Sequence, residues 1–212
     1  MSGNPSRRGV WTPPRHSREV ELGRLPVPSG QLAIRDVYDR ERPQVVLDVP
    51  AGDHRVWVTE VGVGHRRSLV RPAYLSVRLS ETSPVRVESP DGLHHNVIPP
   101  YGASVYTDLG IILLHDAAAI TTADMESLDA DFEQAWESPR AYSQVRSHAG
   151  AAVITCKTVA DTACFPILAS FAENRPVAIH VDFGVAGTHR RVSSLHHMRR
   201  IGYTDSARRQ HQ

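Results

Sequence analysis

The stretch Tyr101–Asp116 reads YGASVYTDLGIILLHD and divides into two halves. The first half is polar and turn-like, and the second contains four consecutive branched apolar residues, Ile111–Leu114. Because strand side chains alternate between the two faces of a sheet, four such residues in a row leave neither face suited to water. We therefore predict a strand buried on both faces, with the acids Asp108 and Asp116 flanking it.

The composition indicates a folded protein of moderate size. The 212-residue chain is long enough for one sizeable core or two small ones. Hydrophobic residues make up 41% and charged residues 22%, so most of the chain should fold. No run approaches the roughly 18 apolar residues of a membrane span, and no apolar run follows the early arginines as in a secretory signal. We predict a soluble, cytoplasmic protein without contact to a membrane.

Charge and cysteine content restrict the function classes further. The formal charge of +1 gives the whole molecule no general affinity for polyanions. The two cysteines, Cys156 and Cys164, lack the CxxC spacing of metal or redox motifs. Two thiols cannot form a structural zinc site unaided, and a cytoplasmic chain keeps them reduced. Buried thiols are the interpretation we favour over redox chemistry.

Short strands at hairpin spacing lie on both sides of the central stretch. They are separated by turn sequences such as Pro28–Gly30 and Pro50–Asp53. The last predicted strand, VAIHVDF, alternates clearly: one face carries apolar residues, and the other carries His180 and Asp182. This order of elements favours an antiparallel β architecture. We divide the chain into a flexible arm (1–18), a single β-rich domain (19–187) and a basic, flexible tail (188–212).

One helix is predicted after the central stretch. Thr121 and Asp124 have the spacing of a capping box, and apolar residues recur at helical intervals until Pro139 ends the pattern, namely Met125, Leu128, Phe132, Ala135 and Trp136. The predicted fold class is therefore α+β and β-rich. We expect an antiparallel sandwich or half-open barrel with one main helix at about 121–138.

The order of several motifs resembles the domain-of-unknown-function family 4241, a bacterial family. The motifs are VPSGQLAIRDVY, VPAGDHRVWV, RPAYLSVRLSETSPVRV, YGASVYTDLGIILLHD and VAIHVDF, between about Leu22 and Phe183. The resemblance implies a β-rich domain with a helix after the segment that contains Asp108-x-Gly110. Between Cys156 and Pro166 the chain lacks the glycine-rich run typical of the family, and only Asp161 matches there. The resemblance carries no established chemistry.

Carboxylates and imidazoles near the central strand form the first candidate site. The candidate catalytic residues are Asp108, His115, Asp116 and Asp161. Asp108 and Asp116, together with His180 and Asp182, are candidate ligands of a divalent metal. Such groups bind divalent cations or divide acid and base work between them. In the competing interpretation Asp108 caps a tight turn at Gly110, Asp116 starts a loop, and His180 and Asp182 face water.

Other kinds of site have less support in the sequence. No GxSxG elbow, HExxH, EF-hand or phosphate-binding glycine loop occurs. The six arginines of the tail, between Arg190 and Arg209, could neutralise phosphates of a nucleic acid, dock on an acidic helix face or remain solvated. No RNA- or DNA-binding motif accompanies them.

Two function classes therefore remain open. The first is a non-catalytic binding or interaction module for a protein or small molecule, favoured because no complete catalytic constellation occurs. The alternative is a hydrolase-type enzyme with an Asp/His site, metal-assisted in one version, around the segment Asp108–Asp116. The sequence leaves the enzyme question, the cofactor and the oligomeric state undecided.

Overall fold

A computed structural model describes residues 17–38, 44–63, 69–90, 92–93, 103–147 and 150–186. The predicted tail and nearly all of the predicted arm lie outside these residues, and the first strand begins at Ser17. The strands are β1 (Ser17–Val27), β2 (Gln31–Asp36), β3 (Val45–Asp48), β4 (Gly52–Val63), β5 (Leu69–Arg78), β6 (Arg86–Glu88), β7 (Ser104–Thr107), β8 (Ile111–Asp116), β9 (Tyr142–Arg146), β10 (Ala152–Lys157), β11 (Ala163–Ala172) and β12 (Arg175–Asp182). The helices are α1 (Thr122–Ser127) and α2 (Asp129–Glu137).

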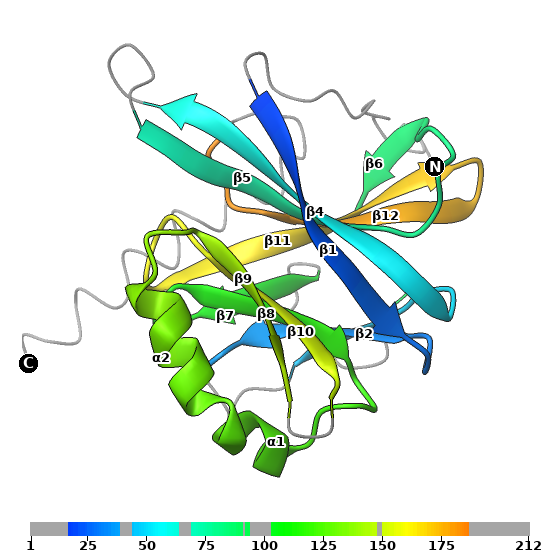
Figure 1. Cartoon of the computed structure of the whole chain (residues 1–212). Coiled ribbons are helices and arrows are strands. Elements are labelled where there is room, and N and C mark those ends of the chain that lie inside the picture. The colour runs from blue at the N-terminus through cyan, green and yellow to red at the C-terminus, as the bar shows by residue number, and fades with distance from the viewer. Residues whose placement is uncertain are drawn as a thin grey trace, which may run out of the picture.

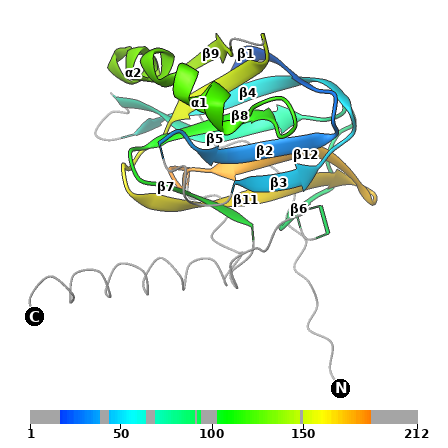
Figure 2. The ribbon, with the colours of Figure 1, turned by 90° about the horizontal axis from the view of Figure 1, so that it is seen from below.

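Two antiparallel sheets form the body of the protein (Figure 1). The larger sheet has seven strands in the order β1-β4-β5-β12-β11-β6, with β7 paired to β11. The smaller sheet has five strands in the order β3-β2-β8-β10-β9. Neither strand path closes on itself among the described residues, and Figure 2 shows the two sheets from below. The predicted β-rich, antiparallel architecture is confirmed.

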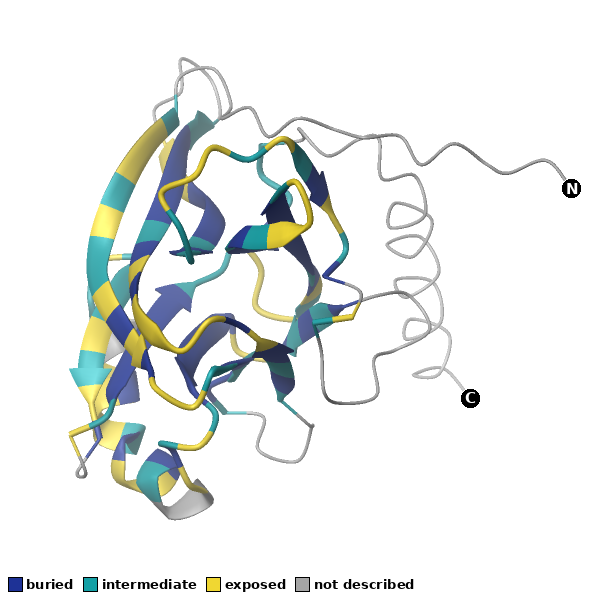
Figure 3. Cartoon of the chain, turned by 90° about the vertical axis from the view of Figure 1, so that its right-hand side faces the viewer, coloured by how far each residue is buried: buried dark blue, intermediate teal, exposed yellow. Residues whose placement is uncertain are grey.

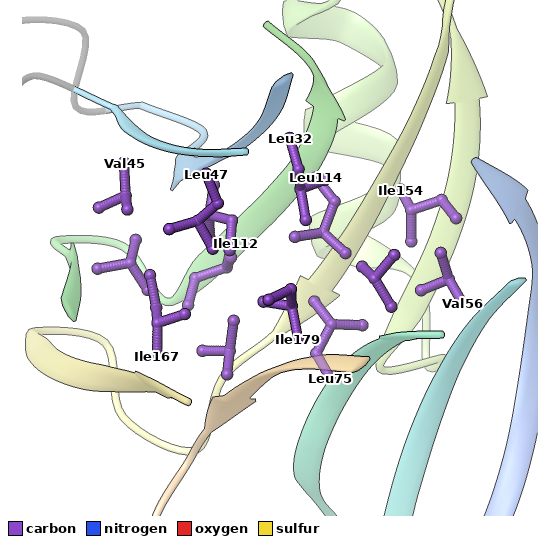
Figure 4. Close-up of a cluster of buried hydrophobic side chains, with 14 of the residues drawn as sticks. Leu32, Val45, Leu47, Val56, Leu75, Ile112, Leu114, Ile154, Ile167 and Ile179 are labelled. Carbon is purple, nitrogen blue, oxygen red and sulfur yellow. The ribbon is translucent and has the colours of Figure 1, made fainter. Parts of the chain in front are cut away.

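The central strand is buried on both faces, as predicted. Every residue of β8 is buried, and β8 lies between β2 and β10 in the smaller sheet. Ile112 and Leu114 face the core between the sheets, where they meet residues such as Leu75 and Ile179 of the larger sheet (Figure 4). Ile111 and Leu113 belong to a second cluster formed with the helices. The strand therefore carries apolar side chains into both layers.

The prediction of one main helix at 121–138 is wrong, because the helix is broken at Leu128. There φ is −91° and ψ is 0°, which ends α1 and precedes α2. The N–H of Leu128 donates to the carbonyl of Met125, three residues earlier, at 3.3 Å. Met125, Leu128 and Phe132 all belong to the second cluster, on both sides of the break. The remaining helix residues are mostly exposed, as Figure 3 shows.

The two predicted helix ends are otherwise correct. Thr121 and Asp124 form the full capping box, with side chain and backbone bonded in both directions. At the other end Ser138 has ψ 138°, the extended conformation that a following proline imposes. The side chains of Ala135 and Trp136 lie outside the described residues.

Candidate functional site

Asp116 uses its carboxylate to hold two loops. The side chain is 2% exposed. One carboxylate oxygen accepts the N–H of Ser29 at 2.8 Å, and the other accepts the N–H of Ala118 at 2.8 Å. Asp116 therefore joins the β1–β2 turn to the loop that leads into α1. This contact is structural, since both carboxylate oxygens satisfy backbone donors.

His115 is buried on the face of β8 that the helices cover. Its Nδ1 lies 2.8 Å from the carbonyl oxygen of Asp116, and because a carbonyl only accepts, the proton is on Nδ1. Nε2 is then an acceptor, and it has no hydrogen-bond partner among the described residues. Burial lowers the pKa of His115 to about 4, so the ring is neutral at neutral pH.

Asp108 and Asp161 lie together at the opposite end of β8. Both are exposed, and Thr162 Oγ1 donates to the Asp108 carbonyl at 3.3 Å. Gly110 has φ 74°, and a Cβ there would lie 3.2 Å from Asp161 Cα. Glycine is thus favoured by the left-handed backbone conformation, and a larger residue would also force the two loops to shift slightly apart.

A buried acid that the sequence analysis missed supports this turn. Asp36 is 2% exposed and accepts hydrogen bonds from the N–H of Tyr38 at 2.7 Å and the N–H of Asp108 at 3.1 Å. Thr107 Oγ1 also donates to Asp36 and accepts the N–H of Gly110. Like Asp116, Asp36 serves as a cap for backbone amides.

The remaining two candidates lie on the larger sheet. His180 and Asp182 project from the outer face of β12, but they are buried, so the competing interpretation in which they face water is wrong. Asp182 accepts the N–H of Gly184 at 2.7 Å. His180 lies between two serines: its Nδ1 is 2.8 Å from Ser76 Oγ and its Nε2 is 2.7 Å from Ser170 Oγ.

The predicted site residues therefore occupy three places. Asp108 and Asp161 lie at one end of β8, His115 and Asp116 at the other, a distance on the order of 17 Å at strand geometry. His180 and Asp182 belong to the other sheet. Among the described residues no group of three or more His, Cys, Asp or Glu side chains could hold a metal ion. The structure does not bring the four predicted metal ligands together.

The two cysteines differ in burial. Cys156 is buried as predicted, and burial raises the pKa of its thiol, which makes it a poor nucleophile. Cys164 is exposed, contrary to the prediction, because it lies at an outward position of β11, opposite Tyr106 of β7.

A hollow of about 190 Å³ on the outer face of the larger sheet is the second candidate site. It is lined by side chains from five neighbouring strands and the loop after β5, including Glu19, Trp57, Ser76, Arg78, Ser170 and His180. The register places Ser76 of β5 directly between Trp57 of β4 and His180 of β12. These three strands lie side by side in Figure 1.

Two of the lining side chains, Arg78 and Trp57, contact each other. The Arg78 guanidinium lies over the Trp57 ring, 5.0 Å from its centre, a cation–π contact. Its ion pairs to Glu81 and Glu19 are 3.6 and 3.9 Å long, beyond hydrogen-bond length. Trp57 Nε1 is buried and has no acceptor among the described residues. A buried donor of this kind is costly unless a ligand satisfies it.

The sequence contained half of the signal for this hollow. Ser76 and Arg78 are on the polar side of one alternating segment, and His180 is on the polar side of another. The pairing of β5 with β12 brings these two polar faces together. Local sequence patterns do not predict the pairing of strands that are so far apart in the chain.

No protein-family model, curated protein or solved structure matches this chain. The resemblance to the domain-of-unknown-function family 4241 therefore stays a prediction. Neither helix in the described part of the chain is long and apolar enough to cross a membrane.

Proposed function

We propose that this protein is a binding module and that its ligand, a small neutral compound with a carbonyl group, occupies the hollow on the larger sheet. The observation that carries the proposal is the Trp57 Nε1–H, a buried donor without an acceptor among the described residues, on a side chain that lines the hollow. A carbonyl oxygen of the ligand accepts this hydrogen bond. Satisfying a buried donor gives the ligand affinity and orientation.

The size of the hollow limits the ligand to a compact molecule. Its volume is about 190 Å³. A cavity of about 150 Å³ holds benzene, so one aromatic ring with a short polar substituent fits.

The surrounding charges favour a neutral ligand. Arg78 and Arg55 form ion pairs with Glu19, Glu21 and Glu81 at 3.6 to 3.9 Å. Three carboxylates near two guanidinium groups create no positive field that would attract a free anion. A neutral carbonyl compound needs no such field, because its oxygen accepts a hydrogen bond without carrying a full charge.

The alternative, a hydrolase site around Asp108–Asp116, has less support. The carboxylate of Asp116 is occupied by backbone donors, and His115 lies at the end of β8 remote from Asp108 and Asp161. Acid–base catalysis needs the proton-transferring groups within hydrogen-bond reach of one substrate. That hypothesis stays a prediction for Asp108 and Asp161 alone.

Benzamide is a suitable probe, because it joins an aromatic ring to an amide carbonyl and resists hydrolysis. We expect the indole N–H signal of Trp57 in an ¹H–¹⁵N NMR spectrum to move downfield and to saturate with benzamide. The chain has three tryptophans, so the Trp57→Phe variant assigns the signal.

Toluene is the matched control, with the same ring and no acceptor. An equal response of the Trp57 signal to toluene, or no response to benzamide up to its solubility limit, would refute the proposal. Trp57→Phe should weaken benzamide binding about 10-fold, the value of one hydrogen bond of roughly 1.4 kcal/mol.

A further inference from the structure

The chain of hydrogen bonds Ser76–His180–Ser170 is not needed to bind a carbonyl group. Ser76 and His180 are directly paired residues of β5 and β12, and Ser170 follows on β11. Both serine hydroxyls lie within 2.8 Å of a ring nitrogen of His180. A hydroxyl held this close to an imidazole nitrogen is the arrangement that activates serine as a nucleophile.

The protonation of the ring distinguishes the two serines. A neutral imidazole has one N–H and one bare nitrogen, so it donates to one serine and accepts from the other. Ser170 is 1% exposed, whereas Ser76 is half-buried in the hollow. With the proton on Nε2, His180 donates to Ser170 and accepts the proton of Ser76. This tautomer activates the serine that a ligand can reach.

Trp57 carries a further hydrogen-bond donor next to Ser76. It is the cross-strand partner of Ser76, and directly paired side chains start about 5 Å apart. The Nε1–H of Trp57 is buried without an acceptor among the described residues. In the step proposed below it donates to the oxygen that gains negative charge.

We propose that the hollow hydrolyses small neutral esters, with Ser76 as the nucleophile and His180 as the general base; this step rests on the proposed function, since the ester must first bind in the hollow. Ser76 Oγ attacks the ester carbonyl carbon while its proton moves to His180 Nδ1. The carbonyl oxygen becomes an oxyanion that accepts a hydrogen bond from Trp57. The intermediate collapses, the C–O bond to the alcohol breaks, and the alcohol leaves with the proton from His180.

Water completes the cycle. It attacks the acyl group on Ser76 and transfers its proton to His180 Nδ1. The second intermediate then releases the carboxylic acid, and Ser76 Oγ regains the proton. Ser170 is a positioning residue, because it holds the Nε2–H of His180 and touches no reacting atom. Its neutral hydroxyl stabilises the imidazolium less than a carboxylate would, so activated esters are the expected substrates and amides are not.

The hydrolysis of p-nitrophenyl acetate by the full chain tests this step. Ser76→Ala should lower kcat/KM at least 100-fold. Ser104→Ala removes a half-buried strand serine of β7 and should leave the rate unchanged. Ser170→Ala should lower kcat with little change in KM, the split expected for positioning. Thermal unfolding of each variant verifies that it is folded.

Labelling with a fluorophosphonate gives an independent measurement, because the reagent modifies an activated serine with loss of fluoride. Peptide mass spectrometry should locate the label on Ser76 and find none after His180→Gln. A label on Ser170 instead, or an unchanged ester rate in Ser76→Ala, overturns the proposal.

The two proposals fail in distinguishable ways. A Trp57 signal that responds to benzamide while Ser76 stays unlabelled overturns hydrolysis and supports binding alone. No response to benzamide together with an unlabelled Ser76 overturns both.

Discussion

Two buried nitrogen atoms, Nε2 of His115 and Nε1 of Trp57, have no hydrogen-bond partner among the described residues, and their surroundings differ. His115 belongs to the smaller sheet, on the face that α1 and α2 cover. Next to it, each carboxylate oxygen of Asp116 accepts a hydrogen bond from a backbone amide. Trp57 belongs to the outer face of the larger sheet and lines a hollow with Ser76 and Arg78.

The difference shows when an unsatisfied polar atom indicates a site. A buried polar atom without a hydrogen-bond partner lowers the stability of the folded protein in either place. Beside His115 the neighbouring carboxylate of Asp116 is hydrogen-bonded to backbone amides of two loops. Beside Trp57 there is room for a ligand, together with loosely paired charges and two serines bonded to His180. The sequence indicated a site at β8 because acidic residues flank a buried strand. The hollow is the better candidate, because it has room for a ligand and a donor without an acceptor among the described residues.

The largest expected effect on stability comes from replacing Asp116, the buried acid at the end of β8. Asp116→Ala leaves the N–H groups of Ser29 and Ala118 without their acceptor. Each bond to a charged group contributes about 1.5 kcal/mol or more, so the free energy of unfolding should fall by about 3 kcal/mol. Urea unfolding measures the change.

Asp108→Asn is the matched control at the other end of the strand, where the side chain is exposed. Its effect should stay within about 0.5 kcal/mol. Equal effects of the two substitutions would contradict the structural role of Asp116.

His115 should make stability depend on pH. Its pKa falls from the ordinary value of 6.5 to about 4 in the folded protein, chiefly because of burial. The folded state therefore binds this proton more weakly than the unfolded state. The contribution of neutral His115 to the free energy of unfolding is complete above about pH 6.5. It is lost as the pH falls towards 4, and the total loss is roughly 3 kcal/mol.

Other histidines titrate in the same range, so the informative quantity is a difference. The free energy of unfolding of the wild type should fall more steeply than that of His115→Gln between pH 6.5 and pH 4.5. Parallel pH profiles for the two proteins would show that His115 does not carry the effect.

Local signals in the sequence predicted local structure well. The capping box of Thr121 located the start of the helix, and the run Ile111–Leu114 identified the doubly buried strand. The break at Leu128 could not be predicted from the apolar pattern, because Met125, Leu128 and Phe132 keep helical spacing across it. The strands β7 and β9 were missed: β7 lies in the stretch interpreted as turn-like, and every residue of β9 is half-buried or exposed.

The site depended on information that no local pattern holds. His180 and Ser76 are 104 positions apart, and the order β4-β5-β12-β11 that aligns them results from long-range strand pairing. Acids near an apolar run are conspicuous in a sequence, but whether their oxygens are free depends on the loops around them. Asp36 illustrates this, since its partners Thr107 and Asp108 belong to a distant turn.

The smallest expected effect on stability comes from the orphan donor in the hollow. Trp57→Phe removes an N–H that has no acceptor among the described residues, so no internal hydrogen bond is lost. The relief from burying an unpaired donor offsets the smaller ring and the weaker contact with Arg78. The free energy of unfolding should change by less than about 1 kcal/mol, while benzamide binding weakens.

Thr107→Val provides the counterpart, a buried donor that is satisfied. Its hydroxyl donates to Asp36 and accepts from Gly110, so the substitution leaves both without this partner. Urea unfolding should show a loss of about 2 kcal/mol, larger than for Trp57→Phe. If Trp57→Phe proves the more destabilising of the two, the relief from the unpaired donor does not offset the lost ring contacts, and the predicted contrast between the two buried donors is wrong.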